Sequence, residues 1–183
     1  MIEEEAIAQG CMDGDRQALQ RLYNTYAGAL YGMCMRYTGD PERSKDLLHD
    51  GFVQVLTHFE QFKWRGEGSL RAWLTTVQRN VILSEMRHES RMEILSADDN
   101  PELIADVPEP ETVADIPPGE LARLIAELPV GYRTVFNLYV IDGLSHREIA
   151  QQLGINEKSS ASQLVHARRQ LSVKIQEWRK ENL

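Results

Sequence analysis

The sequence predicts an all-α protein made of two small helical domains joined by an acidic, flexible linker. Apolar residues recur at intervals of three and four positions through most of the chain, which is the period of an amphipathic helix. No segment alternates apolar and polar residues for long enough to predict a strand. Between residues 92 and 120 the chain has nine Asp or Glu, no Lys or Arg, and five prolines. That composition favours a linker, and 183 residues leave room for a modest core on each side.

The first predicted helix spans about residues 16–37. A second follows the turn Gly39-Asp40-Pro41, where proline suits the first helical position, and continues to about Phe62. In both segments the apolar side chains fall on one face. The predicted inward positions are Leu19, Leu22, Tyr23, Tyr26, Leu30, Met33, Tyr37, Leu47, Leu48, Phe52, Val55, Leu56 and Phe59.

Residues 63–69 contain two glycines and interrupt the helical pattern. A third helix is then expected over about residues 70–89. Its inward positions are Leu70, Trp73, Leu74, Val77, Val81 and Ile82. These helices make up a first domain predicted at 1–91, and the linker is predicted at 92–118.

The second domain is predicted at 119–183. It begins with a helix to about Leu128, a break at Pro129 and a helix over about 130–141. Ser145 and Glu148 then form a capping box, Gly154 suits the left-handed backbone of a helix end, and Asn156 can cap the next helix. Two short helices joined by such a tight turn predict a helix-turn-helix.

The second helix of this pair is predicted to have two unlike faces. Its buried stripe consists of Leu164, Ala167, Leu171, Ile175 and Trp178. Its outer face consists of Lys158, Ser159, Ser162, Gln163, His166 and Arg169. Such side chains suit the major groove of DNA, with an amide for adenine and a cation for guanine or phosphate. The alternative interpretation is an ordinary solvated face.

Charge is segregated along the chain although the net charge is −8. Residues 63–91 carry six basic and three acidic side chains, and residues 121–183 carry nine basic and six acidic. Residues 1–62 carry five basic and ten acidic. Two mildly basic segments therefore flank the acidic linker, and basic segments gain affinity for nucleic acid by releasing counterions from phosphates.

The two cysteines are too few for a disulfide framework and have no metal-ligand spacing. No apolar run reaches the length of about 18 residues that a membrane span needs, and the start MIEEE is unlike a signal peptide. We therefore expect a cytoplasmic protein without membrane insertion. No phosphate-binding loop, nucleophile elbow or paired catalytic carboxylates are visible, so we expect neither an enzyme nor a cofactor or metal.

Three segments of the sequence together resemble two regions of one protein family. DLLHDGFVQVL at 46–56 and GSLRAWLTTVQRNVILSEMRHESR at 68–91 resemble region 2 of bacterial sigma factors of the extracytoplasmic-function (ECF) type. LPVGYRTVFNLYVIDGLSHREIAQQLGINEKSSASQLVHARRQL at 128–171 resembles their region 4. The resemblance covers both predicted domains and implies a specificity subunit that binds core RNA polymerase and directs it to promoter DNA. It also implies an anti-sigma protein as a regulator.

The resemblance assigns residues to three surfaces. Core polymerase would bind Asp46, Leu47, His49, Asp50 and Val53. The melted minus-ten strand would contact Trp64, Arg71, Arg79, Asn80 and Arg87. The minus-thirty-five element would contact Lys158, Ser159, Ser162, Gln163, His166, Arg168 and Arg169. The family often has Lys, Arg and Arg at positions 161, 163 and 166, so weaker attraction to phosphate is implied here.

A base that leaves the stack needs a pocket to receive it, and an aromatic side chain can stack on that base. Trp64 is a candidate wall for this pocket, with core packing as the alternative, whereas Trp73 is expected in the core.

Two other functions remain open from the sequence. A stand-alone helix-turn-helix regulator would bind duplex DNA without polymerase. An adaptor or inhibitor would bind polymerase without reading promoters, so that changing Asn80 would leave transcription untouched.

Overall fold

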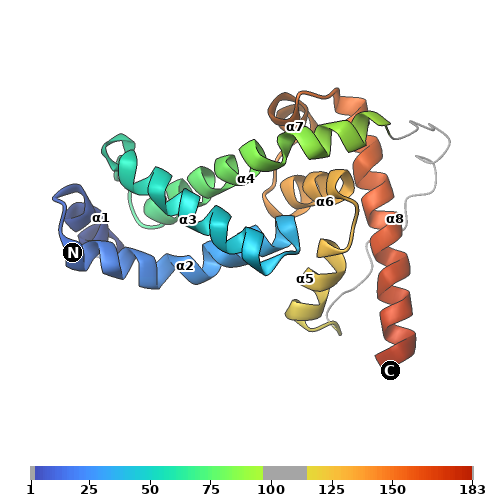
Figure 1. Cartoon of the computed structure of the whole chain (residues 1–183), viewed down its shortest axis with the longest axis horizontal. Coiled ribbons are helices and arrows are strands. Elements are labelled where there is room, and N and C mark those ends of the chain that lie inside the picture. Colours follow the sequence, from blue (N-terminus) through green and yellow to red (C-terminus); the bar gives the residue numbers. More distant parts are fainter. Residues whose placement is uncertain (1–2, 97–114, 183) are drawn as a thin grey trace. The chain divides into compact units, whose positions relative to one another are not determined.

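The structure is a computed structural model that describes residues 3–96 and 115–182 (Figure 1). These residues form helices and no strand, which confirms the predicted all-α class. The chain divides into two compact units, Met1–Ser84 and Glu85–Leu183. Most of the predicted linker, at 97–114, lies outside the described residues. Among the described residues, no helix combines the length and apolar character that a membrane crossing requires.

The helices of the first unit follow the predicted order, with two additions and two shifted ends. The segments α1 and the 3-10 turn η1 were not predicted. The second predicted helix ends five residues early, and the third continues seven residues further. The observed elements are α1 (Glu3–Met12), α2 (Arg16–Thr38), α3 (Pro41–Thr57), η1 (Phe59–Gln61) and α4 (Ser69–Ser96), of which α4 continues beyond Ser84.

Local capping explains where these helices begin and end. The Asp15 carboxylate accepts a hydrogen bond from the Gln17 amide at 2.9 Å and caps α2. Gly39 ends α2 with φ 67°, in the left-handed region that favours glycine. Asp40 then accepts from the amides of Glu42 and Arg43 at 2.8 and 3.1 Å and starts α3. The turn predicted at Gly39-Asp40-Pro41 is therefore confirmed.

The core of the first unit lies where α2 and α3 pack against each other and against α4, and where α1 packs on α2. Most predicted inward positions are buried. Tyr23 and Leu56 are wrong predictions, because their side chains are 48% and 49% exposed. Tyr23 directly follows the buried Leu22, and Leu56 directly follows the buried Val55. One position along a helix rotates the side chain by about 100°, so both side chains point away from the core.

One polar side chain lies at the centre of this core. The amide nitrogen of Gln78 in α4 donates to the Leu47 carbonyl in α3 at 2.8 Å and to the Cys34 sulfur in α2 at 3.3 Å. Gly51 in α3 makes room for it, because a Cβ there would lie 1.9 Å from the Gln78 side-chain oxygen.

Burial raises the pKa of the Cys34 thiol to about 12 and is the main reason that the pKa of Cys11 rises to about 11.

The second unit also follows the predicted order. Its elements are α5 (Pro118–Ala126), α6 (Val130–Phe136), the π-helical turn η3 (Asn137–Ile141), α7 (His146–Leu153) and α8 (Glu157–Asn182). The helix predicted at 130–141 is present, but its second half widens into η3. Ion pairs join α8 to the segment around α5: Arg179 bonds Asp115 at 2.8 Å and Lys174 bonds Glu127 at 2.9 Å.

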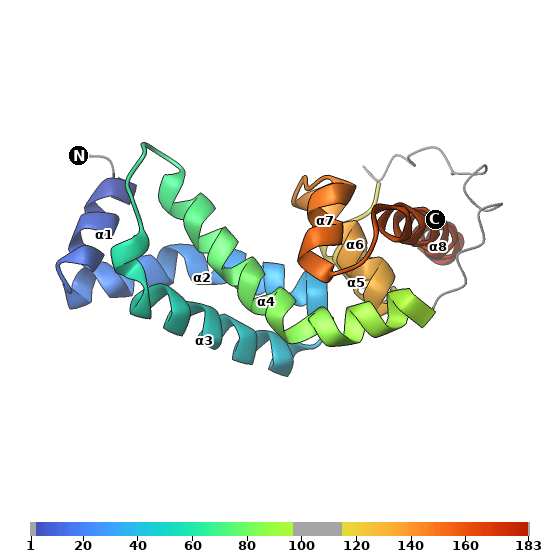
Figure 2. The same ribbon diagram turned by 90° about the horizontal axis from the view of Figure 1, so that it is seen from above.

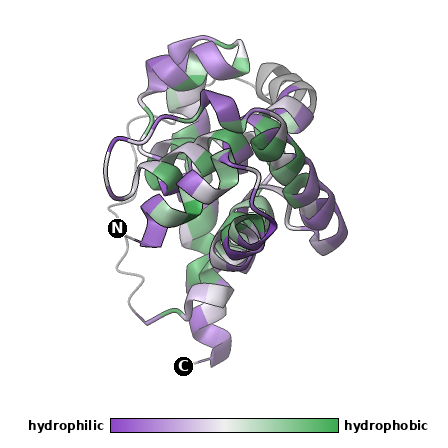
Figure 3. Cartoon of the chain, turned by 90° about the vertical axis from the view of Figure 1, so that its left-hand side faces the viewer, coloured by the Kyte–Doolittle hydropathy of each residue, from purple (hydrophilic) through white to green (hydrophobic). Residues whose placement is uncertain are grey.

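The helix-turn-helix is formed as predicted by α7 and the start of α8. The Ser145 amide donates to the Glu148 carboxylate at 2.8 Å and the Glu148 amide donates to the Ser145 hydroxyl at 3.3 Å, which completes the capping box. Gly154 has φ 67° and the Ile155 amide donates to the Ala150 carbonyl at 3.1 Å. Asn156 accepts from the Ser159 amide at 2.7 Å. Hydropathy colouring shows apolar residues on helix faces that turn towards neighbouring helices, with hydrophilic residues mainly on the outside (Figure 3).

Candidate nucleic-acid interface

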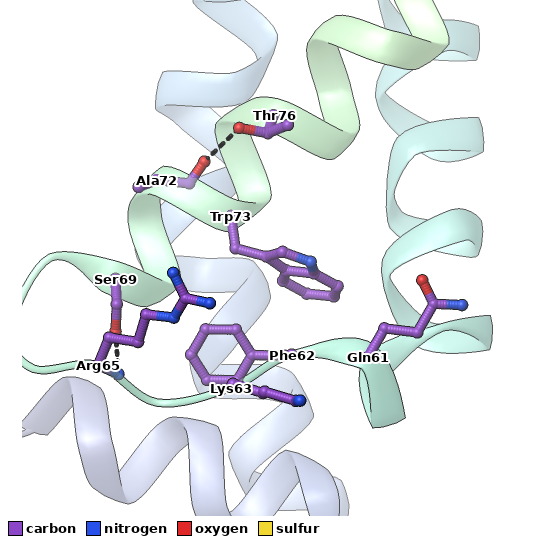
Figure 4. A pocket seen from close by; sticks show the side chains of 8 residues that line it. All are labelled: Gln61, Phe62, Lys63, Arg65, Ser69, Ala72, Trp73 and Thr76. Carbon is purple, nitrogen blue, oxygen red and sulfur yellow. Dashed lines mark hydrogen bonds between the residues drawn. The ribbon is translucent and has the colours of Figure 1, made fainter.

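An open cavity of about 510 Å³ lies between the segment 61–69 and the first turns of α4 (Figure 4). This volume is in the range of about 300–1,000 Å³ that is typical of small-ligand pockets. Two aromatic rings and two basic side chains contribute to its wall. The lining residues are Gln61, Phe62, Lys63, Arg65, Ser69, Ala72, Trp73 and Thr76.

Trp73 and Phe62 form the aromatic wall of this cavity. The Trp73 ring lies 5.3 Å from the Phe59 ring in an edge-on arrangement and 5.4 Å from the Phe62 ring. Its side chain is only half-buried, so the expectation of a pure core role is incomplete. Trp64 is half-buried as well and is not among the residues that line this cavity, so its place beside an unstacked base stays a prediction. The aromatic cluster holds the indole in a fixed orientation with part of its surface open.

The backbone of the loop is shaped by two glycines with positive φ, Gly66 at 108° and Gly68 at 84°. Other residues rarely adopt these angles. The Ser69 hydroxyl donates to the Gly66 carbonyl at 2.6 Å and accepts from the Arg65 amide at 3.3 Å. These bonds fold the loop onto the start of α4 and bring Lys63 and Arg65 to the cavity, where both are exposed.

Four of the five predicted minus-ten residues lie on α4, and they fall on different sides of it. Positions 73, 76, 80 and 87 follow at spacings of three, four and seven, so the exposed Asn80 and Arg87 share a face with the cavity wall. Arg79 is half-buried. Arg71 is exposed and does not line the cavity. Burial is the main reason that the pKa of Tyr26 in α2 is raised, and the positive charge of Arg71 acts in the opposite direction. Thr76 also lines the cavity and was not predicted from the sequence, although its position one turn before Asn80 was a usable signal.

The predicted polymerase-binding residues on α3 form an exposed stripe, with one exception. Asp46, His49, Asp50 and Val53 recur at helical spacing and are exposed. Leu47 is only 4% exposed and its carbonyl accepts the Gln78 bond, so the prediction that it lies on this surface is wrong. Val53 and Leu56 are 45% and 49% exposed, which adds apolar area to the acidic stripe.

In the helix-turn-helix, the predicted DNA contacts divide into exposed and buried sets. Lys158 and Arg169 are exposed, and His166 and Arg168 are half-buried. Ser159, Ser162 and Gln163 are only 4%, 7% and 1% exposed, so the expectation that they lie on an open face is wrong. Gln163 precedes Ala167 by four positions and follows the buried Ser160 by three, which places it at the edge of the core stripe.

Two histidine–tyrosine stacks support this domain. The rings of Tyr139 and His146 are 4.4 Å apart and nearly parallel, and a ring nitrogen of His146 lies 2.9 Å from the Ser160 hydroxyl. Burial, and then the charge of Arg168, lower the pKa of His146, while Glu157 acts in the opposite direction. The His166 ring stacks on Tyr132 at 5.4 Å, which fixes its orientation on α8.

Within residues 3–87 and 115–182, whose side chains the structure describes, no three His, Cys, Asp or Glu groups come together as metal ligands. The candidate surfaces are an aromatic cavity beside exposed cations in the first unit and a helix-turn-helix in the second.

Comparison with known families agrees with this arrangement. The family model for sigma-70 region 2 matches residues 22–92, and the model for sigma-70 region 4 matches residues 119–171. Together they cover more than half of the chain. A relative from Mycobacterium tuberculosis, ECF RNA polymerase sigma factor SigL, is 27% identical over 172 residues, covering 94% of this chain and 97% of the relative. RNA polymerase sigma factor YlaC from Bacillus subtilis is 27% identical, covering 91% and 96%.

Two solved structures have a similar fold. One is the sigma factor RpoE from Bartonella quintana in complex with the anti-sigma factor NepR, with a TM-score of 0.51 and 21% identity over 86% of this chain and 96% of that one. The other is CnrH in complex with the cytosolic domain of CnrY, with a TM-score of 0.50 and 22% identity over 94% of this chain and 97% of that one. With both sigma-70 regions in one chain and relatives that match it over nearly their full length, the chain belongs to the sigma-70 family, as a factor of the ECF type.

Proposed function

We propose that this ECF-type sigma factor binds core RNA polymerase through α3 and directs it to promoters through two DNA-reading surfaces. The proposed domains are 1–91 for polymerase binding and minus-ten recognition, 92–118 as the linker, and 119–183 for minus-thirty-five recognition. The observation that carries this proposal is the cavity beside Trp73, because an open aromatic pocket next to exposed cations suits an unstacked base and its phosphates.

The chemistry of the cavity suits a single-stranded nucleic acid. Stacking of a base on an aromatic ring contributes about 1–3 kcal/mol, which is similar to the cost of unstacking that base. Lys63 and Arg65 place positive charge at the same opening. Asn80 lies further along the same face of α4 and offers a donor and an acceptor to a base edge.

The stripe on α3 suits a protein partner with basic and apolar groups. Asp46 and Asp50 supply negative charge, and Val53 and Leu56 supply apolar area next to it. Complementary charge speeds association and selects the partner, while buried apolar area contributes affinity. We assign this surface to core polymerase because relatives that match nearly the whole chain are named RNA polymerase sigma factors.

The minus-thirty-five surface is assigned to the helix-turn-helix. Lys158 and Arg169 are exposed for contacts with phosphate or guanine. Ser159, Ser162 and Gln163 must become accessible before they can contact a duplex, because they are buried in the chain alone. An anti-sigma protein is proposed as a regulator by analogy with the solved complex of RpoE with the anti-sigma factor NepR, and the cytoplasm is proposed as the place of action.

Run-off transcription with purified core polymerase tests the proposal. We expect Asp50→Ala to weaken assembly with core, and Asn80→Ala to assemble normally but open promoters slowly. Glu60→Ala is the matched control for charge, because Glu60 is exposed and lies outside both surfaces.

Three outcomes would reject parts of this assignment. Failure of the wild-type chain to join core polymerase rejects the sigma role. Tight duplex binding without polymerase would instead indicate a stand-alone regulator. Normal promoter opening by Asn80→Ala removes that residue from strand recognition.

A further inference from the structure

The carboxylate of Glu4, near the start of the chain, lies against the first turn of α4. One of its oxygens accepts a hydrogen bond from the Gly68 amide and the other accepts from the Arg71 amide at 3.0 Å. Gly68 directly precedes α4, and Arg71 is its third residue. Glu4 therefore occupies the position of a helix cap, although it lies 64 residues away from Gly68 in the chain. Figures 1 and 2 both show α1 folded back beside the loop that leads into α4.

The start of α4 depends on the Glu4 carboxylate because the first turn of α4 has no acidic side chain that could cap it. Ser69, the one hydroxyl available there, bonds the loop at Gly66 and Arg65. The unpaired amides and the helix dipole at a helix start favour a negative group. Glu4 supplies that group.

Glu4 is itself held by a third helix. The Tyr26 hydroxyl in α2 has its pKa raised by burial first, and then by the charge of Glu4 and a hydrogen bond to it. Glu4 is half-buried in this position. One carboxylate thus connects α1 and α2 to the start of α4.

The residues that Glu4 holds alternate with residues that line the cavity. Arg65, Ser69 and Ala72 line it, while Gly68 and Arg71 bond Glu4. Gly66 and Gly68 both have positive φ, and glycine loops lose much conformational freedom when ordered. A restraint on Gly68 therefore restricts the cavity wall directly.

We propose that Glu4 is a positioning residue that fixes the loop 63–69 in the form that accepts an unstacked promoter base. This role rests on the proposed function of the cavity. Glu4 does not contact the base; it acts through the Gly68 and Arg71 amides.

The test uses the full-length chain assembled with core polymerase on a duplex promoter template. An abasic site is moved along the non-template strand, and the rate of open-complex formation is measured at each position. With wild type we expect one position at which the abasic site slows opening by about tenfold, the loss of one stacked base. With Glu4→Ala we expect the intact template to be slowed by about fivefold or more and the abasic site to add little.

Three further measurements separate positioning from stability. Glu3→Ala removes the same charge from the same turn at an exposed position, and it should behave as wild type. Glu4→Gln keeps the side-chain size and one acceptor oxygen, so it should fall between wild type and Glu4→Ala. Thermal melting and assembly with core report whether each variant is folded.

The outcomes distinguish the two proposals. If wild type has no position sensitive to the abasic site, the cavity does not bind a base and the role of Glu4 falls with it. If wild type has such a position and Glu4→Ala has the same intact-to-abasic ratio, only the positioning role is overturned. A smaller ratio in folded Glu4→Ala, with an unchanged ratio in Glu3→Ala, supports it.

Discussion

Replacing Gly51 by alanine is expected to destabilise the first unit, although alanine is the better helix former. The new Cβ would lie 1.9, 2.6 and 2.9 Å from the oxygen, carbon and nitrogen of the Gln78 amide. That amide is 1% exposed and bonds both Leu47 and Cys34, so it cannot move away without leaving polar groups unpaired. Gly51 therefore tests whether this contact holds α3 against α4.

The magnitude follows from three opposing effects. Overpacking a core costs about 1–3 kcal/mol, and an unsatisfied buried polar group costs about 1–3 kcal/mol. Exchanging glycine for alanine inside a helix stabilises the helix by about 1 kcal/mol. The free energy of unfolding should therefore fall by about 1–5 kcal/mol. Gly28 and Gly32 in α2 are controls, because a Cβ at either position meets nothing within 4 Å. Their alanine variants should be more stable by up to about 1 kcal/mol.

Urea unfolding followed by circular dichroism measures these differences, and the slope m shows whether the unfolded states remain comparable. The double variant Gly51→Ala with Gln78→Ala should lose less stability than the sum of the single variants, because alanine at 78 removes the clash. If Gly51→Ala is as stable as Gly28→Ala, or if the two effects in the double variant simply add, the Gln78 amide does not limit the space at position 51.

Three further predictions concern the cavity and the helix-turn-helix. Trp73→Leu should slow promoter opening by about tenfold because the stacking surface is lost, whereas Trp64→Leu should stay within about twofold; equal effects in run-off assays would place the strand elsewhere. Ser145→Ala should lower the stability of the second unit by about 1 kcal/mol in urea unfolding, and an unchanged midpoint would mean that the capping box contributes nothing. His146 should make stability fall on acidification. Because its folded pKa is lowered, its contribution is complete above the ordinary value of 6.5 and is lost as pH falls through that value to the folded pKa. The difference between urea midpoints at pH 7.5 and 5.5 should therefore shrink in His146→Gln, and a variant as acid-sensitive as wild type would exclude this residue.

Local signals account for the parts of the fold that could be predicted from the sequence. Asp40 followed by proline, Ser145 paired with Glu148, and Gly154 act on neighbouring backbone groups, so the helix boundaries that they set were visible in the sequence. The periodicity of apolar residues gave the faces of the long helices. The same periodicity misplaced Tyr23 and Leu56, because it marks a broad stripe and does not locate the edge of the core.

The candidate site was less predictable because it depends on contacts between distant segments. Loop residues have no period, so the sequence left Trp64 open between the pocket and the core, and the apolar period of the third helix predicted Trp73, which lines the cavity, to be a core residue. The role of α1 depends on Glu4 reaching Gly68, which no neighbouring residue signals. The burial of Gln163 likewise depends on what packs beside α8, whereas its polar type alone suggested an open face.

The sulfur of Cys34 accepts a hydrogen bond in the core, and its raised pKa leaves almost no thiolate near neutral pH. Thiolate is the form that reacts with alkylating and oxidising agents. Both cysteines of this chain are therefore expected to react slowly while the helices around them stay packed together. The rate at which a maleimide labels Cys34 should therefore report how often α2, α3 and α4 separate, without any engineered probe.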